Sequence, residues 1–299
     1  MSKFQIATKT QAKLRLALQG PSGGGKTYSA LSIASHIAPL AKVAVIDTEH
    51  GSAAKYASDF PGFSTLCLTN SYAPVTFIEA IKDAEQSGFD VVIIDSLTHA
   101  WNGPGGFLEM VDEECKRMIA KNHKPDSFAA WKNLTPIYNR LVQAIVGSKC
   151  HVICCLRAKQ EYEKVKNEST GKVEVKKVGM APEMRDNFQY EMDIEGMLTM
   201  DHDFIVGKTR CPSIDGKVYN KPGKEFAGML TSWLSDGAVP VTPTPSLKDA
   251  YAAVMAKTSM TKQIALDLAA EVCGHQVNTA ADIKPDEIAK VIACWEAQP

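Results

Sequence analysis

Short apolar runs alternate with longer amphipathic stretches over the first 235 residues of the chain. The apolar runs have the length of strands and fall at residues 14–19, 42–47, 64–68, 90–95 and 151–156. Stretches with helical periodicity lie between them, among them residues 27–37 and 75–87. The run DVVIID at residues 90–95 is apolar at every position between its two aspartates, which is typical of a strand buried on both faces of a parallel sheet. The pattern therefore predicts an α/β fold, a central and mostly parallel sheet flanked by helices.

The pattern changes in the last third of the chain. Residues 191–200, 203–208 and 217–220 favour antiparallel strands. The segment GAVPVTPTPS at residues 237–246 contains three prolines and little apolar surface to bury, so it predicts an extended linker. Residues 247–299 carry helical periodicity in three pieces, LKDAYAAVMAK, TKQIALDLAAEVCG and PDEIAKVIACWEA, the last with Pro285 in its first turn. We therefore expect a core of residues 1–236, a linker of residues 237–246 and a small all-helical module of residues 247–299.

Composition excludes several classes of protein. The chain has 299 residues with 33 basic and 34 acidic side chains, so it lacks the bulk positive charge of many nucleic-acid-binding proteins. Any such binding must come from local clusters. No apolar run approaches the ~18 residues that span a bilayer, and the first twenty residues lack the apolar centre of a signal peptide. A cytoplasmic protein is the resulting expectation.

Eight cysteines are scattered along the chain without a CxxC pair. Four potential metal ligands lie close together in KCHVICCL, namely Cys150, His151, Cys154 and Cys155. The segment is an apolar run that predicts a buried strand, and adjacent residues of a strand point to opposite faces. We therefore interpret these thiols as packing groups of a reduced protein rather than as a metal site.

A glycine-rich loop follows the first predicted strand and precedes the first predicted helix. Its sequence GPSGGGKT fits the phosphate-binding pattern GxxxxGK[ST]. Glycines let the backbone N–H groups curl around phosphates at the positive end of a helix. Lys26 is expected to neutralise the β- and γ-phosphates of ATP, and Thr27 to hold Mg²⁺. The expected nucleotide-binding residues are Gly20, Pro21, Ser22, Gly23, Gly24, Gly25, Lys26, Thr27 and Tyr28.

Two acidic residues complete a candidate hydrolytic site. Asp95 ends the buried strand 90–95, at the sheet edge where ligands bind in α/β folds, and is the predicted second metal ligand. Glu49 follows the strand 42–47, which we expect to neighbour the strand that precedes the glycine-rich loop. It is the best candidate for orienting the attacking water, while an ordinary surface acid is the alternative.

Several segments resemble RecA-type recombinases, in the same order and at similar intervals over residues 14–210. VIDTEHGSAAKY resembles the segment with the family's catalytic glutamate, which implies that role for Glu49 and adenine stacking for Tyr56. VVIIDSLTHAW resembles the Walker B strand. HVICCLRAK resembles the phosphate-sensing strand, although Arg157 stands where the family has glutamine. VGKTRCP resembles the paired cations that reach a neighbouring subunit's ATP, which implies that role for Lys208 and Arg210 in a ring or filament.

Other features resemble a narrower group, the Sak-type RecA-core ATPases of bacteriophages. These features are the short core, WNGPGGFLEMVDE after the Walker B strand, GKVYNKPGKEF and the proline-rich linker. The resemblance implies DNA-stimulated ATP hydrolysis in phage recombination, annealing or replication within the bacterial host. It also implies single-stranded DNA as a partner, together with a single-strand binding or annealing protein. The alternative is an ATP-gated switch or loader that binds proteins and not DNA.

The resemblance implies two DNA-binding loops, at about residues 100–127 and 159–187. The second contains NESTGK, which predicts a hairpin tip between two exposed strands. Its predicted DNA-binding residues are Lys164, Lys166, Lys172, Lys176, Lys177 and Arg185. Lysines can follow the phosphates of a single strand while an aromatic residue stacks on a base. A solvated hairpin without DNA is the alternative, because glutamates are interspersed among these lysines. For Phe128, Trp131 and Tyr138, which precede this loop, helical spacing favours packing in the core.

Overall fold

The computed structural model describes residues 12–166, 173–237, 247, 251, 261–284 and 287–296. The chain divides into two compact units, Met1–Ala238 and Val239–Pro299, each of which is described by itself. None of the helices in the described residues is long and apolar enough to cross a membrane.

The larger unit is built on one nine-stranded sheet with the order β3-β2-β4-β5-β1-β7-β8-β9, and β6 pairs with β5 alone. Neighbours from β3 to β7 run parallel, whereas β8 and β9 are antiparallel, which confirms the predicted α/β fold. The strands are β1 (Arg15–Gly20), β2 (Val43–Asp47), β3 (Ser64–Cys67), β4 (Val91–Asp95), β5 (His151–Lys166), β6 (Val173–Pro182), β7 (Ile194–Leu198), β8 (Asp203–Thr209) and β9 (Val218–Asn220).

Two details of the predicted sheet are wrong. The strand expected at residues 191–200 begins only at Ile194, because Phe188–Glu191 forms the short helix α6, and β7 pairs parallel with β1 as well as antiparallel with β8. The strand that leads to Glu49 does not neighbour the strand before the glycine-rich loop, since β4 and β5 lie between β2 and β1. Sequence periodicity marks strands but carries no information on their order.

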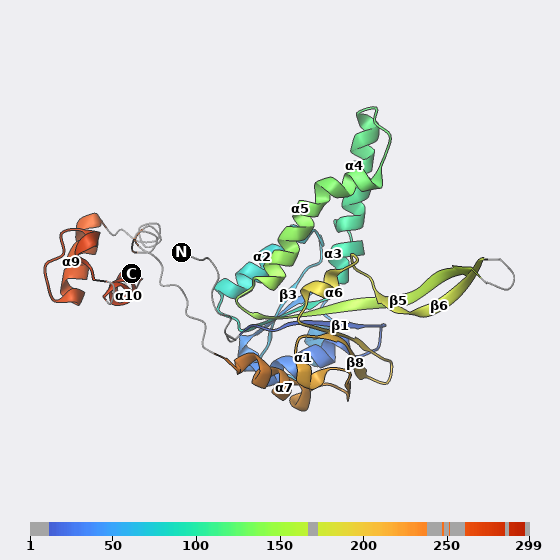
Figure 1. The fold of residues 1–299 in the computed structure, drawn as a ribbon, viewed down its shortest axis with the longest axis horizontal. Coiled ribbons are helices and arrows are strands. Elements are labelled where there is room, and N and C mark those ends of the chain that lie inside the picture. Colours follow the sequence, from blue (N-terminus) through green and yellow to red (C-terminus); the bar gives the residue numbers. More distant parts are fainter. Residues whose placement is uncertain are drawn as a thin grey trace, which may run out of the picture. The chain divides into compact units, whose positions relative to one another are not determined.

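Helices cover both faces of this sheet (Figure 1). On one face lie α1 (Lys26–Ile37) and α7 (Lys224–Ser235), and on the other lie α2 (Pro74–Gln86) and α5 (Ser127–Val146). Strand β4 shows how the sequence produces this arrangement. Val91 and Ile93 belong to the core beneath α1 and α7, Val92 and Ile94 belong to the core beneath α2 and α5, and all four side chains are fully buried. Successive residues of a strand point to opposite faces, so a continuous apolar run supplies both cores.

A helical arm replaces the first predicted DNA-binding loop. Residues 98–120 form α3 (Thr98–Asn102) and α4 (Phe107–Ala120), and α4 runs along α5 through a small core that contains Val111 and Leu134 (Figure 1). The prediction that α5 buries its aromatic residues holds for Tyr138, which is buried, and for Trp131, which packs partly buried. It is wrong for Phe128, whose side chain is 84% exposed at the start of the helix.

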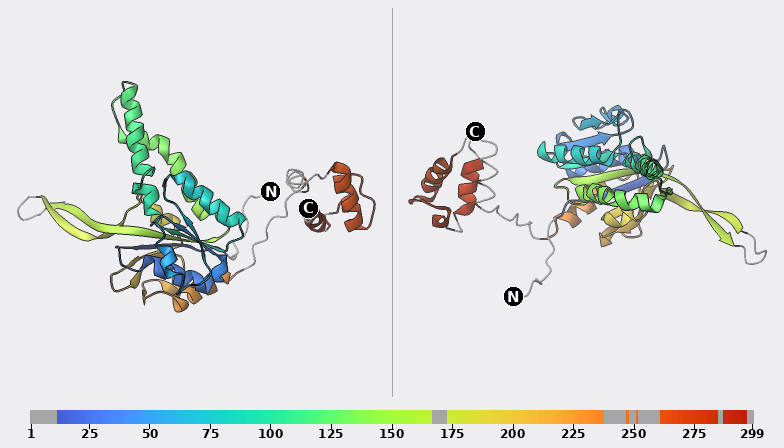
Figure 2. Two further views of the ribbon diagram at one scale, coloured as in Figure 1. Left: turned by 180° about the vertical axis from the view of Figure 1, so that it is seen from behind. Right: turned by 90° about the horizontal axis from the view of Figure 1, so that it is seen from above.

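A long two-stranded ribbon forms the second extension of this unit. Strand β5 was expected to end near Leu156 but continues to Lys166, and it pairs antiparallel with β6 beyond the edge of the helical layers (Figure 2). The predicted tip NESTGK, which includes Lys172, lies outside the described residues. The expectation of a charged hairpin is therefore met for its two strands.

The smaller unit contains α9 (Lys262–Cys273) and α10 (Ile288–Glu296), which pack around Ala269, Val291 and Trp295. The indole Nε1 of Trp295 donates to the carbonyl of Ala265 at 2.9 Å and ties the two helices together. Residues 238–246 of the predicted linker, most of the predicted helix at 247–257, and Pro285 lie outside the described residues.

One buried cation, Arg15, holds several chain segments of the larger unit together. The guanidinium of Arg15 is 5% exposed and donates to the carbonyls of Leu14, Val146, Ser148 and Cys150. Buried carbonyls without a donor are destabilising, so this single side chain satisfies groups from the residue before β1, the end of α5 and the turn before β5.

We therefore predict that Arg15→Ala lowers the free energy of unfolding by about 3 kcal/mol, because several carbonyls lose their donor at once. Urea unfolding followed by tryptophan fluorescence measures the change. Lys13→Ala, which alters an exposed cation two residues away, is the control and should change stability by less than ~0.5 kcal/mol. Equal effects of the two variants would contradict the assigned role.

Candidate active site

The glycine-rich loop lies between β1 and α1, as its sequence predicted. Gly23 and Gly25 have φ angles of 84° and 85°, in the left-handed region that favours glycine, and Gly25 caps the start of α1. The ammonium Nζ of Lys26 donates to the carbonyls of Gly20 and Pro21 at 3.0 and 2.9 Å. The loop thus wraps around the lysine, and the N–H groups at the helix start suit an anion.

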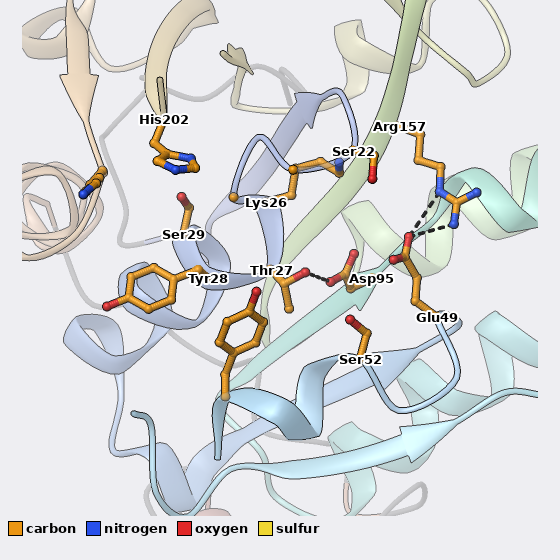
Figure 3. Close-up of a pocket in the computed structure, with 14 residues that line it drawn as sticks. Ser22, Lys26, Thr27, Tyr28, Ser29, Glu49, Ser52, Asp95, Arg157 and His202 are labelled. Carbon is orange, nitrogen blue, oxygen red and sulfur yellow. Dashed lines mark hydrogen bonds and ion pairs between the residues drawn. The ribbon is translucent and has the colours of Figure 1, made fainter. Parts of the chain in front are cut away.

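Thr27 and Asp95 meet at the carboxyl edge of the sheet, where a metal ligand pair was predicted. The hydroxyl Oγ1 of Thr27 donates to Oδ2 of Asp95 at 2.5 Å (Figure 3). The pKa of Asp95 is raised to about 6, chiefly by burial; the hydrogen bond from Thr27 and the charge of Lys26 act to lower it, while the nearby carboxylates of Glu49 and Asp47 act to raise it. A desolvated carboxylate beside a hydroxyl and a phosphate loop is a donor set that fits Mg²⁺ bound with a nucleotide.

Asp47 positions the segment that carries Glu49. Its buried carboxylate accepts the backbone N–H of Glu49 at 2.7 Å and that of Ala53 at 2.8 Å. These bonds fold residues 48–53 over the end of β2. Glu49 therefore reaches the site although β4 and β5 separate its strand from β1. The sequence pattern identified Asp47 as a strand end and not as a positioning residue.

Glu49 forms an ion pair with Arg157, the residue at the predicted phosphate-sensor position. Both Nε and Nη2 of Arg157 donate to Oε1 of Glu49, at 3.1 and 3.0 Å (Figure 3). The backbone N–H of Arg157 donates to Oγ1 of Thr98, which fixes the strand at this point. The predicted catalytic acid and the predicted sensor are therefore direct neighbours, on segments 108 residues apart.

These residues surround a cavity of about 740 Å³, within the range of ligand pockets. Of the residues predicted to contact the nucleotide, Tyr28 and Tyr56 also line it, with their rings edge to face at 5.8 Å. The lining further includes four residues that the sequence did not suggest: Ser29, Ser52, His202 and Lys221. His202 lies in a turn that packs against the glycine-rich loop, and the N–H of Lys221 donates to the carbonyl of His202. No motif marks such turns.

Lys208 and Arg210 do not line this cavity in the described part of the chain. The Lys208 ammonium donates to the carbonyls of Gln189, Tyr190 and Met192, and burial lowers its pKa. Arg210 lies one residue beyond β8 and pairs with Asp193 at 3.2 Å. A contribution to a neighbouring subunit's site stays a prediction for both.

The predicted DNA-binding residues fall into two groups. Lys164 and Lys166 lie on β5, and Lys176 and Lys177 lie on β6. Arg185 lies beyond the ribbon, where its guanidinium stacks over the rings of Tyr138 and Trp131, at 4.5 and 5.1 Å from their centres. Stacking of this kind gives Arg185 a packing role beside α5, separate from the lysines of the ribbon.

The cysteines considered as metal ligands lie in the core. Cys150, Cys154 and Cys155 are buried, and Nδ1 of His151 accepts the N–H of Leu14 at 3.0 Å. A different group of potential ligands occurs in the smaller unit, where donor atoms of Cys273, His275 and Glu287 lie within 4.8 Å of one another. Glu287 there accepts the N–H of Lys284 and pairs with His275, bonds that already account for its position just before α10.

The raised pKa of Asp95 predicts a pH-dependent gain in stability on its neutralisation. The unfolded chain has its aspartate pKa near ~3.9, so charged Asp95 destabilises the nucleotide-free fold above pH 6, and the penalty disappears as pH falls toward 4. We expect Asp95→Asn to increase the free energy of unfolding by about 2 kcal/mol at pH 7.5 and by much less at pH 4.5. Urea unfolding at both pH values measures this.

Asp59→Asn, at an exposed position, is the matched control and should show no gain. Asp95→Asn should also abolish Mg²⁺-dependent nucleotide binding, because a neutral amide is a poor ligand for Mg²⁺. A loss of stability at pH 7.5, or an equal gain at both pH values, would contradict the assigned burial penalty.

Comparison with known proteins agrees with this geometry. Residues 12–226, most of the chain and all of the elements that form the site, match the family model described as an AAA domain. No curated protein matches the chain. The matched segment begins just before β1 and ends within α7, so it contains the glycine-rich loop, Asp95, Glu49 and Arg157. The chain therefore belongs to the AAA domain family, and its larger unit is an AAA-type P-loop ATPase domain.

Proposed function

We propose that this ATPase domain couples Mg²⁺-dependent ATP hydrolysis to binding of single-stranded DNA, in phage recombination, annealing or replication. The observation that carries the proposal is the continuity of β5. This strand holds Arg157 at the nucleotide site and runs without interruption to Lys166 on the ribbon. At ~3.3 Å per residue, the lysine lies about 30 Å from the arginine along one strand.

The ion pair between Arg157 and Glu49 supplies the coupling at the nucleotide end. A γ-phosphate entering beside Lys26 attracts the Arg157 guanidinium, which is then less available to Glu49. Glu49 is thereby freed to orient the attacking water and accept its proton. Because Arg157 is part of β5, a shift of its side chain and backbone is transmitted to the ribbon.

The other residues divide the remaining tasks. The glycine-rich loop and Lys26 bind the phosphates, while Thr27 and Asp95 hold Mg²⁺, which neutralises charge on the transferring group. Lys208 and Arg210 act on the ATP of a neighbouring subunit in a ring or filament, where additional cations stabilise the transition state. Tyr56 offers an aromatic ring to the adenine.

The pairing of β5 with β6 separates the charges of the ribbon into two faces. Tyr162 pairs with Lys177, Lys164 with Val175, and Lys166 with Val173, so these positions share one face. Glu163 pairs with Lys176 and Val165 with Glu174, on the other face. Among these paired positions, the first face has three lysines and no acidic residue, whereas the second has two glutamates and one lysine. None of the glutamates at these paired positions therefore falls on the first face.

A second candidate function is an ATP-gated switch that binds a protein partner. The observation that favours it is exposed apolar surface on the helical arm, where Ile119 is 56% exposed and Phe128 is 84% exposed. Large apolar side chains at such a site are typical of protein contacts. If the protein is such a switch, ATP turnover is insensitive to DNA, whereas under the first proposal it rises with DNA.

We predict that Glu49→Gln lowers the maximal ATPase rate by about 10²–10⁴-fold, the usual contribution of a general base, with ATP affinity changed only a few-fold. Steady-state phosphate release and equilibrium nucleotide binding measure the two quantities. Glu79→Gln, at an exposed position on α2, is the control. A Glu49→Gln enzyme with the wild-type rate would remove Glu49 from the mechanism.

Alanine at Lys164, Lys166 and Lys177 together should weaken single-stranded DNA binding and remove its stimulation of ATP turnover. The slope of log affinity against log salt should become shallower by about 2, because each phosphate that is no longer neutralised by a lysine takes ~0.7 from it. Lys176→Ala is the matched control, because it removes a neighbouring lysine from the opposite face. Equal losses of affinity from Lys176→Ala and Lys177→Ala would contradict the assignment of faces, and a wild-type rate unaffected by DNA would favour the protein switch.

A further inference from the structure

The turn between β7 and β8 packs directly against the glycine-rich loop. A Cβ atom added at Gly20 would lie 2.8 Å from the carbonyl oxygen of Leu198, and one at Gly24 would lie 3.3 Å from that of Thr199. The turn is closed by the N–H of His202, which donates to the carbonyl of Thr199 at 3.1 Å. Because these loop residues are glycines, the turn can pack closely against the loop and lie beside the nucleotide cavity.

His202 has an unusual place within that turn. Its φ angle is 65°, in the left-handed region that few residues other than glycine adopt. Its carbonyl accepts the N–H of Lys221 at 2.8 Å, and Lys221 also has a positive φ, of 47°. Two turns held in rare conformations thus place two polar side chains, an imidazole and an ammonium, on the lining of one cavity.

Within the described residues, the imidazole of His202 carries a buried nitrogen without a hydrogen-bond partner. Nδ1 is enclosed, accepts and donates no hydrogen bond within the described residues, and lies 3.0 Å from the position of a Cβ atom at Gly25. Buried polar atoms are almost always hydrogen-bonded, so an unpartnered one on a side chain that lines a ligand cavity points to a bond made by the ligand.

The position of His202 indicates which part of the nucleotide it meets. Figure 3 shows Glu49 and Arg157 on one side of the Thr27–Asp95 pair, and Tyr28, Ser29 and His202 on the other. Hydrolysis occurs beside Glu49, so the γ-phosphate belongs to that side. The nucleoside, at the other end of the triphosphate, then extends toward His202.

We infer that His202 is a nucleoside-recognition residue, whose imidazole forms a hydrogen bond with the ribose or base of the bound nucleotide. A ribose hydroxyl both donates and accepts, so it suits either tautomer of the imidazole. Lys221 borders the same end of the cavity and adds a second donor there. The inference rests on the proposed ATP binding but adds a residue outside the phosphate loop, one that acts on affinity and not on the chemical step.

The test compares the affinities of ATP, ADP and inorganic tripolyphosphate, which has the phosphates but no nucleoside. In the full chain, His202→Phe keeps the ring and removes the nitrogen, and should weaken ATP and ADP by about tenfold each. Tripolyphosphate affinity should stay within about twofold of wild type. His202→Asn, which tolerates the left-handed conformation and offers a polar atom near the Nδ1 position, should recover part of the loss.

Asp201→Ala, at the exposed neighbour in the same turn, is the control and should leave all three affinities unchanged. Equal losses for ATP and tripolyphosphate in both His202 variants would overturn the inference, because His202 would then only support the phosphate loop. Unchanged ATP affinity in His202→Phe would overturn it as well. Failure of the ATP binding on which the inference rests is distinguishable, since the wild-type chain would then bind neither ATP nor tripolyphosphate, and failure of the coupling to DNA would leave these affinities unchanged.

Discussion

The candidate active site depends on one constraint, the burial of a charged carboxylate at the edge of the sheet. Asp95 is 2% exposed and keeps its position through the hydroxyl of Thr27. Water alone would solvate this group better, so the fold accepts a destabilising charge at a position whose donor groups fit a cation. The parallel sheet makes that possible, because it brings the ends of β1, β2, β4 and β5 to one edge while apolar side chains fill both faces behind them.

Local sequence signals predicted what local physics determines. The apolar runs identified where the strands of the core begin, to within a few residues, and the glycine pattern identified the loop whose Gly23 and Gly25 adopt positive φ angles. Strand order was not predictable, because it depends on how crossovers pack and not on any one run. Two of the site residues that were missed, Asp47 and His202, act through backbone groups and turns brought together by that order.

Sequence periodicity also did not predict how far β5 and α5 extend beyond the core. Strand β5 has one apolar part inside the sheet and one charged part outside it, so its sequence pattern changes while its backbone does not. Phe128 differs from its prediction for a related cause, since its helical spacing matched that of Tyr138 although its end of α5 lies beyond the core. Periodicity reports the face of a helix, whereas burial also requires a neighbouring element at that level.

A net charge near zero is compatible with local recognition of a polyanion. The pairing of β5 and β6 collects three lysine positions on one face of the ribbon and leaves the glutamates among the described strand positions 162–166 and 173–177 on the other. Attraction to phosphates is screened within about 10 Å at ordinary salt. The charge on the face nearest to a DNA strand therefore matters more than the net charge of the whole chain. Strand β5 carries Arg157, which contacts Glu49, in its first half and two lysines of the ribbon near its end. A phosphate that binds beside Arg157 therefore acts on the same strand that holds those lysines.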